Sequence, residues 1–375
     1  MTDQQATLGG AAAPAIAPCS APWAPDPYLH VGDDRIYNPL TNRTIRAGEA
    51  GYAELHGLIA GTLPLAAVAE EVVARLREGE WLVEGDAELD SRFFLKVVSL
   101  EAHTVCNQSC YFCPVSLKPR PSYFMPTELY EDILRQLAAY RSTIEAVCMI
   151  NYNEPTADRR FLDQVRAIKA VGLPPAVLTN GSGLTPQRID ALLEMGGLCY
   201  FSVNLSTLDR ERYARERGAD QLALVLRNLD YLKDKPLAET MEIMVLGIGD
   251  ERHAEDFRTI RERFAGSLLE VKSHEVMDRA GHLPVGRRPA GGGRLCGCEN
   301  LGSRPLQHLH ITPQAKCVLC CEDYDENYVV GDLTKTSLDE ILTGPAYRQM
   351  RRWVYGREAA PENFICNKCV FALRR

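Results

Sequence analysis

Three cysteines lie close together in the segment HTVCNQSCYFCPVS, residues 103–116. Cys106, Cys110 and Cys113 are separated by three and then by two residues. A structural zinc site usually closes with four ligands in two separated pairs, and the nearest further candidate here is the single His103. Soft thiolates also hold the irons of a cubane iron–sulfur cluster, in which three ligands leave one iron open. The spacing therefore favours a four-iron cluster with a free position for a substrate or cofactor.

Cysteine usage elsewhere supports metal chemistry. The chain holds 13 cysteines, and in a reducing compartment clustered thiols indicate metal binding or catalysis more often than disulfides. Cys19, Cys148 and Cys199 are isolated, and the last two fall in apolar runs where packing is expected. The largest group lies near the C-terminus and consists of Cys296, Cys298, Cys317, Cys320, Cys321, Cys366 and Cys369.

The overall composition limits the partners. Of 375 residues, 46% are hydrophobic and 25% are charged, which is typical of a soluble protein with a sizeable core. A formal net charge of −8 without a Lys/Arg run gives no support for a nucleic-acid partner, and no apolar run reaches the length of a membrane span. Residues 1–25 lack the basic start and apolar core of a signal peptide. We therefore expect a flexible tail over residues 1–25 and a cytoplasmic protein.

Alternating strand and helix patterns surround the cysteine loop. Helical periodicity alternates with short apolar, β-branched runs, which indicates right-handed crossovers and a parallel sheet. Because sites on such sheets lie at the carboxyl ends of the strands, residues that follow each strand are the candidates. The expected strands are 94–102, 145–152, 175–181, 198–206, 241–247 and 268–274, and the expected helices are 127–140, 158–172, 185–196, 220–234 and 254–264.

The Cys-x3-Cys-x2-Cys pattern, with Phe112 just before the last cysteine, resembles the signature of the radical S-adenosylmethionine (radical SAM) superfamily. The resemblance implies an α/β fold with a partial (β/α)6 barrel over residues 91–280. It also implies a 4Fe-4S cluster whose open iron binds the methionine part of SAM. An electron from an external donor of the flavodoxin or ferredoxin type then cleaves SAM, and the 5′-deoxyadenosyl radical abstracts hydrogen from a substrate.

Segments after the later strands also resemble this superfamily. NEP after the second strand, TNG after the third, SVNLS after the fourth and YARERG beyond it match its SAM-contacting positions in order. Asn153 stands where the family has Gly, and each segment taken alone also suits a turn. The resemblance implies that SAM is contacted by Phe112, Asn153, Glu154, Thr179, Asn180, Ser202, Asn204 and Arg217.

Residues 281–375 resemble the auxiliary-cluster domain called SPASM, in its shorter twitch form of a β-hairpin plus a helix. A linker or loop is expected over residues 285–302, Ala315 stands where the family has Gly, and Gly331 with Asp332 fits a second turn. The resemblance implies an auxiliary 4Fe-4S cluster held by Cys298, Cys320, Cys366 and Cys369. Cys296 is the alternative to Cys298, and a zinc site built from the same four is the alternative to the cluster.

Three cysteines of this domain are left over. Cys296, Cys317 and Cys321 are candidate hydrogen donors to a substrate radical, because an S–H bond is weaker than most C–H bonds. Cys320 and Cys321 are expected to follow one another on a strand, where neighbouring side chains point to opposite faces. Packing is the more common role of a surplus cysteine.

The N-terminal region, residues 26–90, is similar to small α+β domains of the PqqD type. Short strands are expected over residues 28–48, with helices over 49–61 and 64–85. Domains of this type bind leader peptides by adding a strand to a sheet edge. The region therefore indicates a possible peptide partner, or alternatively a structural cap on the barrel.

Two functions follow from these patterns. In the first, the radical acts on a small polyhydroxylated natural-product intermediate, such as a sugar or an aminocyclitol, with epimerisation or dehydrogenation as the outcome. In the second, the chain is a maturase that modifies a ribosomally made precursor peptide held by the N-terminal domain. The single auxiliary cluster favours the first.

Overall fold

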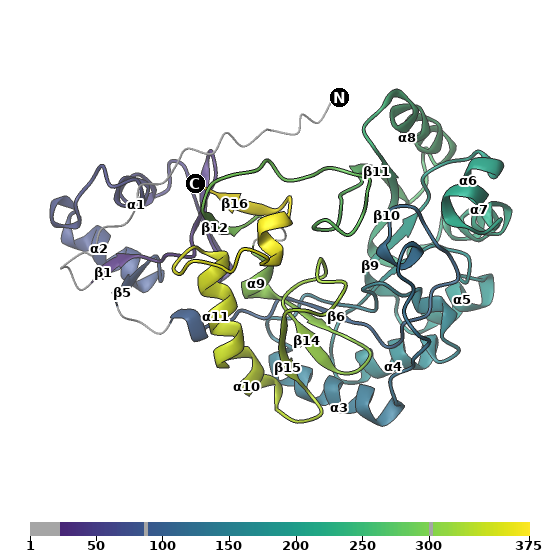
Figure 1. Ribbon diagram of the computed structural model, residues 1–375, viewed down its shortest axis with the longest axis horizontal. Coiled ribbons are helices and arrows are strands. Elements are labelled where there is room, and N and C mark those ends of the chain that lie inside the picture. The colour runs from purple at the N-terminus through teal and green to yellow at the C-terminus, as the bar shows by residue number, and fades with distance from the viewer. Residues whose placement is uncertain (1–22, 86–88, 300–302) are drawn as a thin grey trace.

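The computed structural model describes residues 23–85, 89–299 and 303–375 (Figure 1). The predicted tail therefore falls mostly outside the described residues, and so does Cys19. The prediction of a flexible tail is wrong for residues 23–25. Trp23–Pro25 form strand β1, which pairs antiparallel with β5, Leu82–Glu84. The predicted second helix is also too long, since β5 occupies its final residues.

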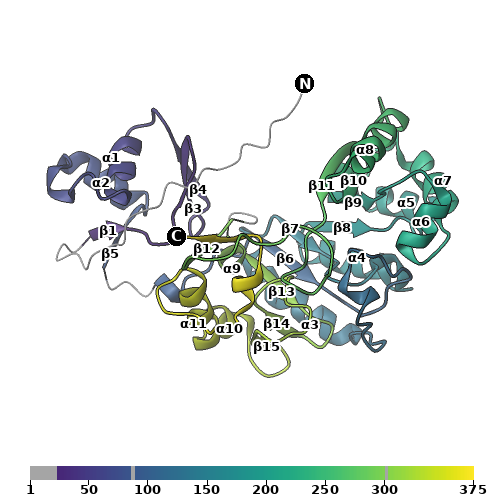
Figure 2. The same cartoon turned by 45° about the horizontal axis from the view of Figure 1, so that its top comes forward.

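The N-terminal region has its own small core. It contains a three-stranded sheet in the order β2-β3-β4 and two helices that bury Ile36, Leu55 and Leu76 among other apolar side chains. In Figures 1 and 2 these helices lie at the opposite end of the molecule from the helices of the large sheet. The elements are β2 (His30–Val31), β3 (Arg35–Asn38), β4 (Arg43–Arg46), α1 (Tyr52–Ile59) and α2 (Glu70–Glu78).

A nine-stranded sheet forms the centre of the fold, in the order β11-β10-β9-β8-β7-β6-β13-β14-β15. The six strands from β6 to β11 are parallel, as predicted for the partial barrel, and β13 adds to β6 in the same direction. They are β6 (Val97–Leu100), β7 (Ala146–Cys148), β8 (Pro175–Thr179), β9 (Leu198–Asn204), β10 (Ala238–Gly247) and β11 (Glu270–Glu275).

Helices cover one face of this sheet because every second strand residue is apolar. Val98, Val147, Phe201 and Ile243 share the helix-covered face and are fully buried in the main core. The residues between them form the opposite, inner face of the partial barrel. The covering helices are α3 (Thr127–Leu137), α4 (Phe161–Ala170), α5 (Pro186–Glu194), α6 (Arg210–Arg217), α7 (Leu222–Leu232) and α8 (Glu251–Arg263).

The C-terminal region continues the barrel sheet and does not form a separate layer. Its hairpin strands pair antiparallel, and β13 joins them to β6, so this region lies between the N-terminal domain and the barrel helices (Figure 2). The elements are β12 (Leu295–Cys298), α9 (Arg304–Gln307), β13 (His308–Ile311), β14 (Lys316–Val318), β15 (Val329–Asp332), α10 (Leu338–Leu342), α11 (Pro345–Val354) and β16 (Ala372–Arg374).

Two predictions for this region need correction. The segment 285–302 is not all loop, since it contains β12, which pairs with β16. Gly331 and Asp332 lie inside β15 and not in a turn. Ala315 does occupy a left-handed turn position, with φ of 61°, the conformation that explains why a glycine suits that site. Among the described residues, none of the helices combines the length and the apolar character needed to cross a bilayer.

Candidate functional site

The loop that carries Cys106, Cys110 and Cys113 follows β6 at the carboxyl edge of the sheet and is held by α6. The Ser109 amide donates to the Arg217 carbonyl at 2.9 Å, and the Tyr111 amide donates to the Glu216 carbonyl at 3.1 Å. These bonds fix the backbone on both sides of Cys110. The loop therefore depends on a helix that lies a hundred residues later in the chain.

Side chains within the loop add a second set of contacts. Gln108 donates through Nε2 to the Tyr213 hydroxyl and to the Gln221 side-chain oxygen, both at 3.0 Å. Asn107 Nδ2 donates to the Ser182 hydroxyl at 2.9 Å. These polar partners were not predicted. Their only signal in the sequence is that polar residues separate the cysteines.

Arg217 joins the loop to the end of β9. Its guanidinium donates to the Asn204 side-chain oxygen and, at 3.0 Å, to the Ser206 hydroxyl, and it approaches Cys110 Sγ at 3.6 Å. It also stacks over the Phe112 ring, 4.7 Å from the centroid. The structure thus brings together Phe112, Asn204 and Arg217, three of the residues that the sequence singled out.

Glu154 occupies the centre of a second group. One carboxylate oxygen accepts from the Thr156 amide at 3.1 Å and from the Thr179 hydroxyl at 2.6 Å, and the other accepts from the Asn180 amide at 2.7 Å. The second oxygen keeps acceptor capacity for a ligand. Asn153 lies beside this group, where its amide nitrogen contacts the Met149 carbonyl at 3.3 Å.

Ser202 is placed differently from the other predicted residues. It lies inside β9, opposite Leu178 and Glu242 on the neighbouring strands, and its side chain belongs to the inner face. The inner face is polar at several positions. Tyr200 donates to Glu242 at 2.6 Å, and Lys272 forms an ion pair with the same carboxylate.

The three thiols of the loop share one environment. Burial is the main reason that the pKa of Cys106 is raised to about 12, and the negative charge of Glu154 and of the thiolates of Cys110 and Cys113 adds to this effect. The pKa of Cys113 is raised by burial and, among other groups, by Cys110. Closely spaced thiolates that repel one another suit a cationic iron cluster that all of them bind.

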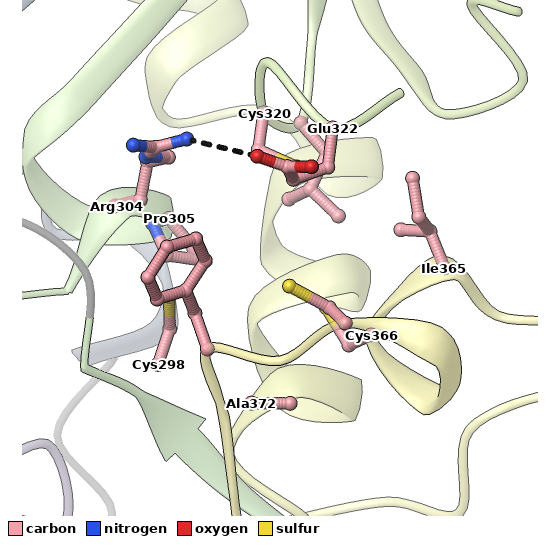
Figure 3. Close-up of a pocket in the computed structure, with 11 residues that line it drawn as sticks. Cys298, Arg304, Pro305, Cys320, Glu322, Ile365, Cys366 and Ala372 are labelled. Carbon is pink, nitrogen blue, oxygen red and sulfur yellow. Dashed lines mark ion pairs between the residues drawn. The ribbon is translucent and has the colours of Figure 1, made fainter. Parts of the chain in front are cut away.

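Four other cysteines line a single pocket in the C-terminal region (Figure 3). Cys298 comes from β12, Cys320 follows β14, and Cys366 and Cys369 come from the turn before β16. Burial raises the pKa of Cys320 well above its usual value, with additional contributions from Cys366 and Cys369. This four-thiol donor set fits a cubane, which takes one thiolate at each of four irons. Within the described residues, no three metal-ligating side chains converge on one single-ion site.

The three surplus cysteines separate in the structure. Cys296, the alternative to Cys298, lies near Arg375 and does not line the pocket. An irregularity of β12 between Leu295 and Gly297 separates it from the face that Cys298 presents. Cys317 is fully buried in the core. Cys321 lies outside the pocket lining, but its sulfur contacts the Arg304 guanidinium and lies 3.7 Å from a Glu322 oxygen, and both of those residues line the pocket.

Cys320 and Cys321 are not strand residues, contrary to the prediction. β14 ends at Val318, and both cysteines lie in the turn that follows. The alternation argument therefore does not apply to them. Cys320 nevertheless lines the pocket and Cys321 does not, so the turn separates their side chains.

Charged groups lie between the two cysteine sites, since Arg279 acts on the pKa of Cys113 and Arg304 contacts Cys321. Glu322 accepts from Arg279 at 3.3 Å and lies 3.9 Å from Arg304. Tyr152 donates to the Cys321 carbonyl, and the pKa of Tyr152 is raised well above its usual value by burial, with opposing influence from Arg279. Sequence reasoning missed this group because single charged residues in loops carry no periodic signal.

Comparison with known families agrees with the geometry. Residues 100–260 match the family model of the radical SAM superfamily, and residues 298–370 match that of the SPASM iron–sulfur cluster-binding domain. The chain thus contains a radical SAM domain followed by a SPASM domain. These domains imply SAM, the 4Fe-4S cluster that binds it and an auxiliary cluster.

Curated relatives match over part of their length. The chain is 30% identical over 112 residues to the tungsten-containing aldehyde ferredoxin oxidoreductase cofactor-modifying protein of Pyrococcus furiosus, covering 30% of this chain and 31% of the relative. It is 29% identical over 107 residues to the S-adenosyl-L-methionine-dependent 2-deoxy-scyllo-inosamine dehydrogenase of Niallia circulans, covering 27% and 41%. The matches thus span less than half of each relative.

Two solved structures are similar to the chain. Streptococcus suis SuiB bound to precursor peptide SuiA has a TM-score of 0.55 at 12% identity, and the match covers 93% of both chains. BtrN in complex with AdoMet and 2-DOIA has a TM-score of 0.48 at 18% identity, covering 72% of this chain and 92% of BtrN. The likeness to SuiB, at this identity, concerns the fold alone.

Proposed function

We propose that this radical SAM enzyme acts on a small polyhydroxylated molecule, a sugar or an aminocyclitol, and inverts or oxidises one carbon. The proposal rests on how the C-terminal region meets the barrel. We name residues 319–328 the bridging loop. It contacts loops at the carboxyl ends of three barrel strands, which restricts access to the inner face.

The contacts of the bridging loop come from residues 321–325. Tyr324 donates to the Lys118 carbonyl at 2.5 Å, and Asp325 pairs with the Lys118 ammonium at 2.6 Å. Tyr152 and Arg279 bind Cys321 and Glu322. A covered inner face with several polar side chains suits a small hydroxylated ligand better than an extended peptide. The partial likeness to the inosamine dehydrogenase supports the same substrate class.

The chain's own residues have separate roles in this proposal. Cys106, Cys110 and Cys113 hold the cluster that supplies reductive SAM cleavage, while Glu154, Thr179, Asn180, Asn204 and Arg217, with Phe112, Asn153 and Ser202, form the SAM site. Cys298, Cys320, Cys366 and Cys369 hold the auxiliary cluster. Cys321 is the best placed of the three surplus thiols to donate hydrogen, because it alone contacts the charged groups between the two sites.

Product analysis in D2O tests the proposal. The reconstituted enzyme is incubated with SAM, a reductant and a panel of sugars and aminocyclitols. The masses of the products are then measured by mass spectrometry. Loss of two hydrogens indicates dehydrogenation, and gain of one deuterium indicates inversion. If no polyol is changed while 5′-deoxyadenosine forms, the substrate class is wrong.

Substitution of Cys321 separates the two outcomes. If the reaction is an inversion, Cys321→Ala should still consume SAM in the presence of substrate but should deliver no inverted product. Cys317→Ala and Cys296→Ala are the matched controls and should keep inversion. Full inversion by Cys321→Ala would show that the donor lies elsewhere.

A precursor-peptide maturase is the second candidate. The feature that favours it is the N-terminal sheet, in which β2 and β4 lie at the two edges and could take an added strand. Pull-down of a candidate leader peptide by the full chain tests this function. Binding that is lost when the β4 edge is blocked by proline would favour the maturase over the small-molecule enzyme.

A further inference from the structure

Two buried histidines occupy the inner face of β13. His308 and His310 are 6% and 0% exposed, and their rings stack with centroids 3.9 Å apart. β13 runs beside β6, with His310 opposite Ser99, so both rings lie on the inner face. The Ser99 hydroxyl contacts His308 Nε2 at 2.9 Å. The polar side chains recur at every second position of an otherwise apolar strand.

Most of the hydrogen-bonding capacity of this pair is unused. His308 Nδ1 and both ring nitrogens of His310 are buried and have no partner among the described residues. A buried polar atom without a partner destabilises the fold, so such atoms call for an explanation. His253, on the helix-covered side, differs because both of its ring nitrogens have partners. They contact the Gly249 amide and the Val245 carbonyl.

The charge around the pair defines what it can bind. Burial, together with the nearby Arg304 cation, holds the pKa of His310 well below its usual value, and the same causes act on His308. Both rings are therefore neutral at physiological pH, and each neutral imidazole offers one donor and one acceptor. A hydroxyl group also donates and accepts, whereas an ammonium group would meet the Arg304 cation.

Arg304 lies near both the histidine pair and Cys321, the proposed hydrogen donor. Its guanidinium contacts Cys321 Sγ and lines the four-cysteine pocket. It also influences the pKa of Cys148, which lies on the inner face opposite Ser99. The histidine pair, Arg304 and Cys321 thus lie in one neighbourhood, between the barrel and the C-terminal region.

We propose that His308 and His310 form a hydroxyl-binding subsite, which holds adjacent hydroxyl groups of a small polyhydroxylated substrate beside Cys321. This subsite deepens the proposed function and rests on it. His308 is oriented by Ser99 and offers Nδ1, and His310 offers both nitrogens. An ordered water is the competing occupant, because it can satisfy the same nitrogens.

Calorimetric titration of the reconstituted holoenzyme with SAM bound tests the subsite. The probe is myo-inositol, and cyclohexanol is the comparison ligand with the same ring size and a single hydroxyl. His310→Phe keeps a ring that can stack on His308 but removes both nitrogens, whereas His310→Gln keeps a donor and an acceptor. His253→Gln is the matched control, a buried histidine on the other face of the sheet.

We expect His310→Phe to weaken myo-inositol binding about tenfold, the effect of one or two lost hydrogen bonds. His310→Gln and His253→Gln should stay within about threefold of the parent chain, and SAM affinity should not change in any variant. Unchanged myo-inositol affinity in His310→Phe would overturn the subsite and favour a bound water. Absence of myo-inositol binding by the parent chain would overturn it as well.

The titration also separates this inference from the proposed function. If myo-inositol binds in a manner that depends on His310, but no polyol is converted in the product analysis, the subsite stands and the proposed reaction fails. If polyols are converted and His310→Phe has unchanged affinity, the proposed function stands and the subsite is wrong.

Discussion

Gly218 is the position where a single methyl group should disturb the proposed SAM-binding cluster. It ends α6 with φ of 65°, a left-handed conformation, directly after Arg217. A Cβ at this position would overlap the Ser109 hydroxyl oxygen and lie 3.4 Å from the Ser109 Cβ. Since Ser109 lies between the cysteines and bonds to the Arg217 carbonyl, the overlap would push the loop away from the helix.

The cost of Gly218→Ala has two parts. Placing an L-residue in the left-handed region costs about 1–2 kcal/mol. Overpacking against Ser109 adds about 1–3 kcal/mol. Gly266 is the matched control, because it also has a left-handed φ, of 76°, but a Cβ there would meet no atom within 4 Å. Gly266→Ala should therefore carry only the first cost.

Iron content and SAM cleavage report the effect of Gly218→Ala. We expect this variant to lose about four of about eight irons, those of one cubane, and to lose most of its 5′-deoxyadenosine production. Gly266→Ala should keep both. Adding Ser109→Ala to Gly218→Ala removes the overlapping oxygen and should restore the iron. If Gly218→Ala matches Gly266→Ala in iron content and SAM cleavage, the helix contact does not position the cysteine loop.

Three further predictions address the clusters and the stability of the fold. Replacing Cys106, Cys110 and Cys113 together with Ala should abolish reductive SAM cleavage and leave about half of the iron; retained 5′-deoxyadenosine would contradict the assignment. Burial raises the pKa of Asp26 to about 6, so its protonated form stabilises the fold at low pH, and this contribution is lost as the pH rises through about 6. Asp26→Asn should therefore raise the unfolding temperature at pH 7.5 more than at pH 4.5, and an equal shift at both would refute the linkage. Arg351 is fully buried and, within the described part of the chain, donates only to backbone carbonyls. Arg351→Met should therefore cost more than about 4 kcal/mol and reduce the soluble yield, which Arg352→Met should not.

The barrel was predictable because its signal is periodic. Apolar residues recur at every second position in the strands and at helical spacing between them, and each pattern repeats along residues 94–275. The cysteine loop was predictable for a different reason, since three thiols at fixed spacing have few alternative uses. In both cases the information lies within a short stretch of the sequence.

α6 was missed for a physical reason. Its sequence, RERYARER, has no apolar stripe, and only Tyr213 and Arg217 are buried. The helix is stabilised by its ends, where the Asp209 side chain accepts from the Arg212 amide at 2.9 Å and Gly218 adopts the left-handed conformation. End effects of this kind are invisible to a periodicity argument.

The pairing of β13 with β6 could not be read from the sequence either. The two strands are separated by about two hundred residues, and no local feature specifies their pairing. This pairing places His310 beside Ser99 and carries the bridging loop back across the barrel. The alternation in HLHI was the available signal, because a polar residue at every second position of an apolar strand marks a face with a special use.

The turn after β14 carries side chains that bear on both outcomes of the proposed function, inversion and dehydrogenation. Cys320 faces the four-cysteine pocket, while Cys321 faces Arg304 and Glu322. A substrate radical near this turn would gain a hydrogen atom from the Cys321 thiol, or it would lose an electron to the auxiliary cluster that Cys298, Cys320, Cys366 and Cys369 would hold. Loss of the electron becomes easier as the neighbouring hydroxyl gives up its proton. A hydrogen bond from that hydroxyl to a histidine nitrogen would polarise its O–H bond without full proton transfer, because burial and Arg304 hold the pKa of His310 low. The hydrogen bond at His310 would therefore bear on the choice between inversion and dehydrogenation, which is why binding and product analysis belong together in the His310 variants.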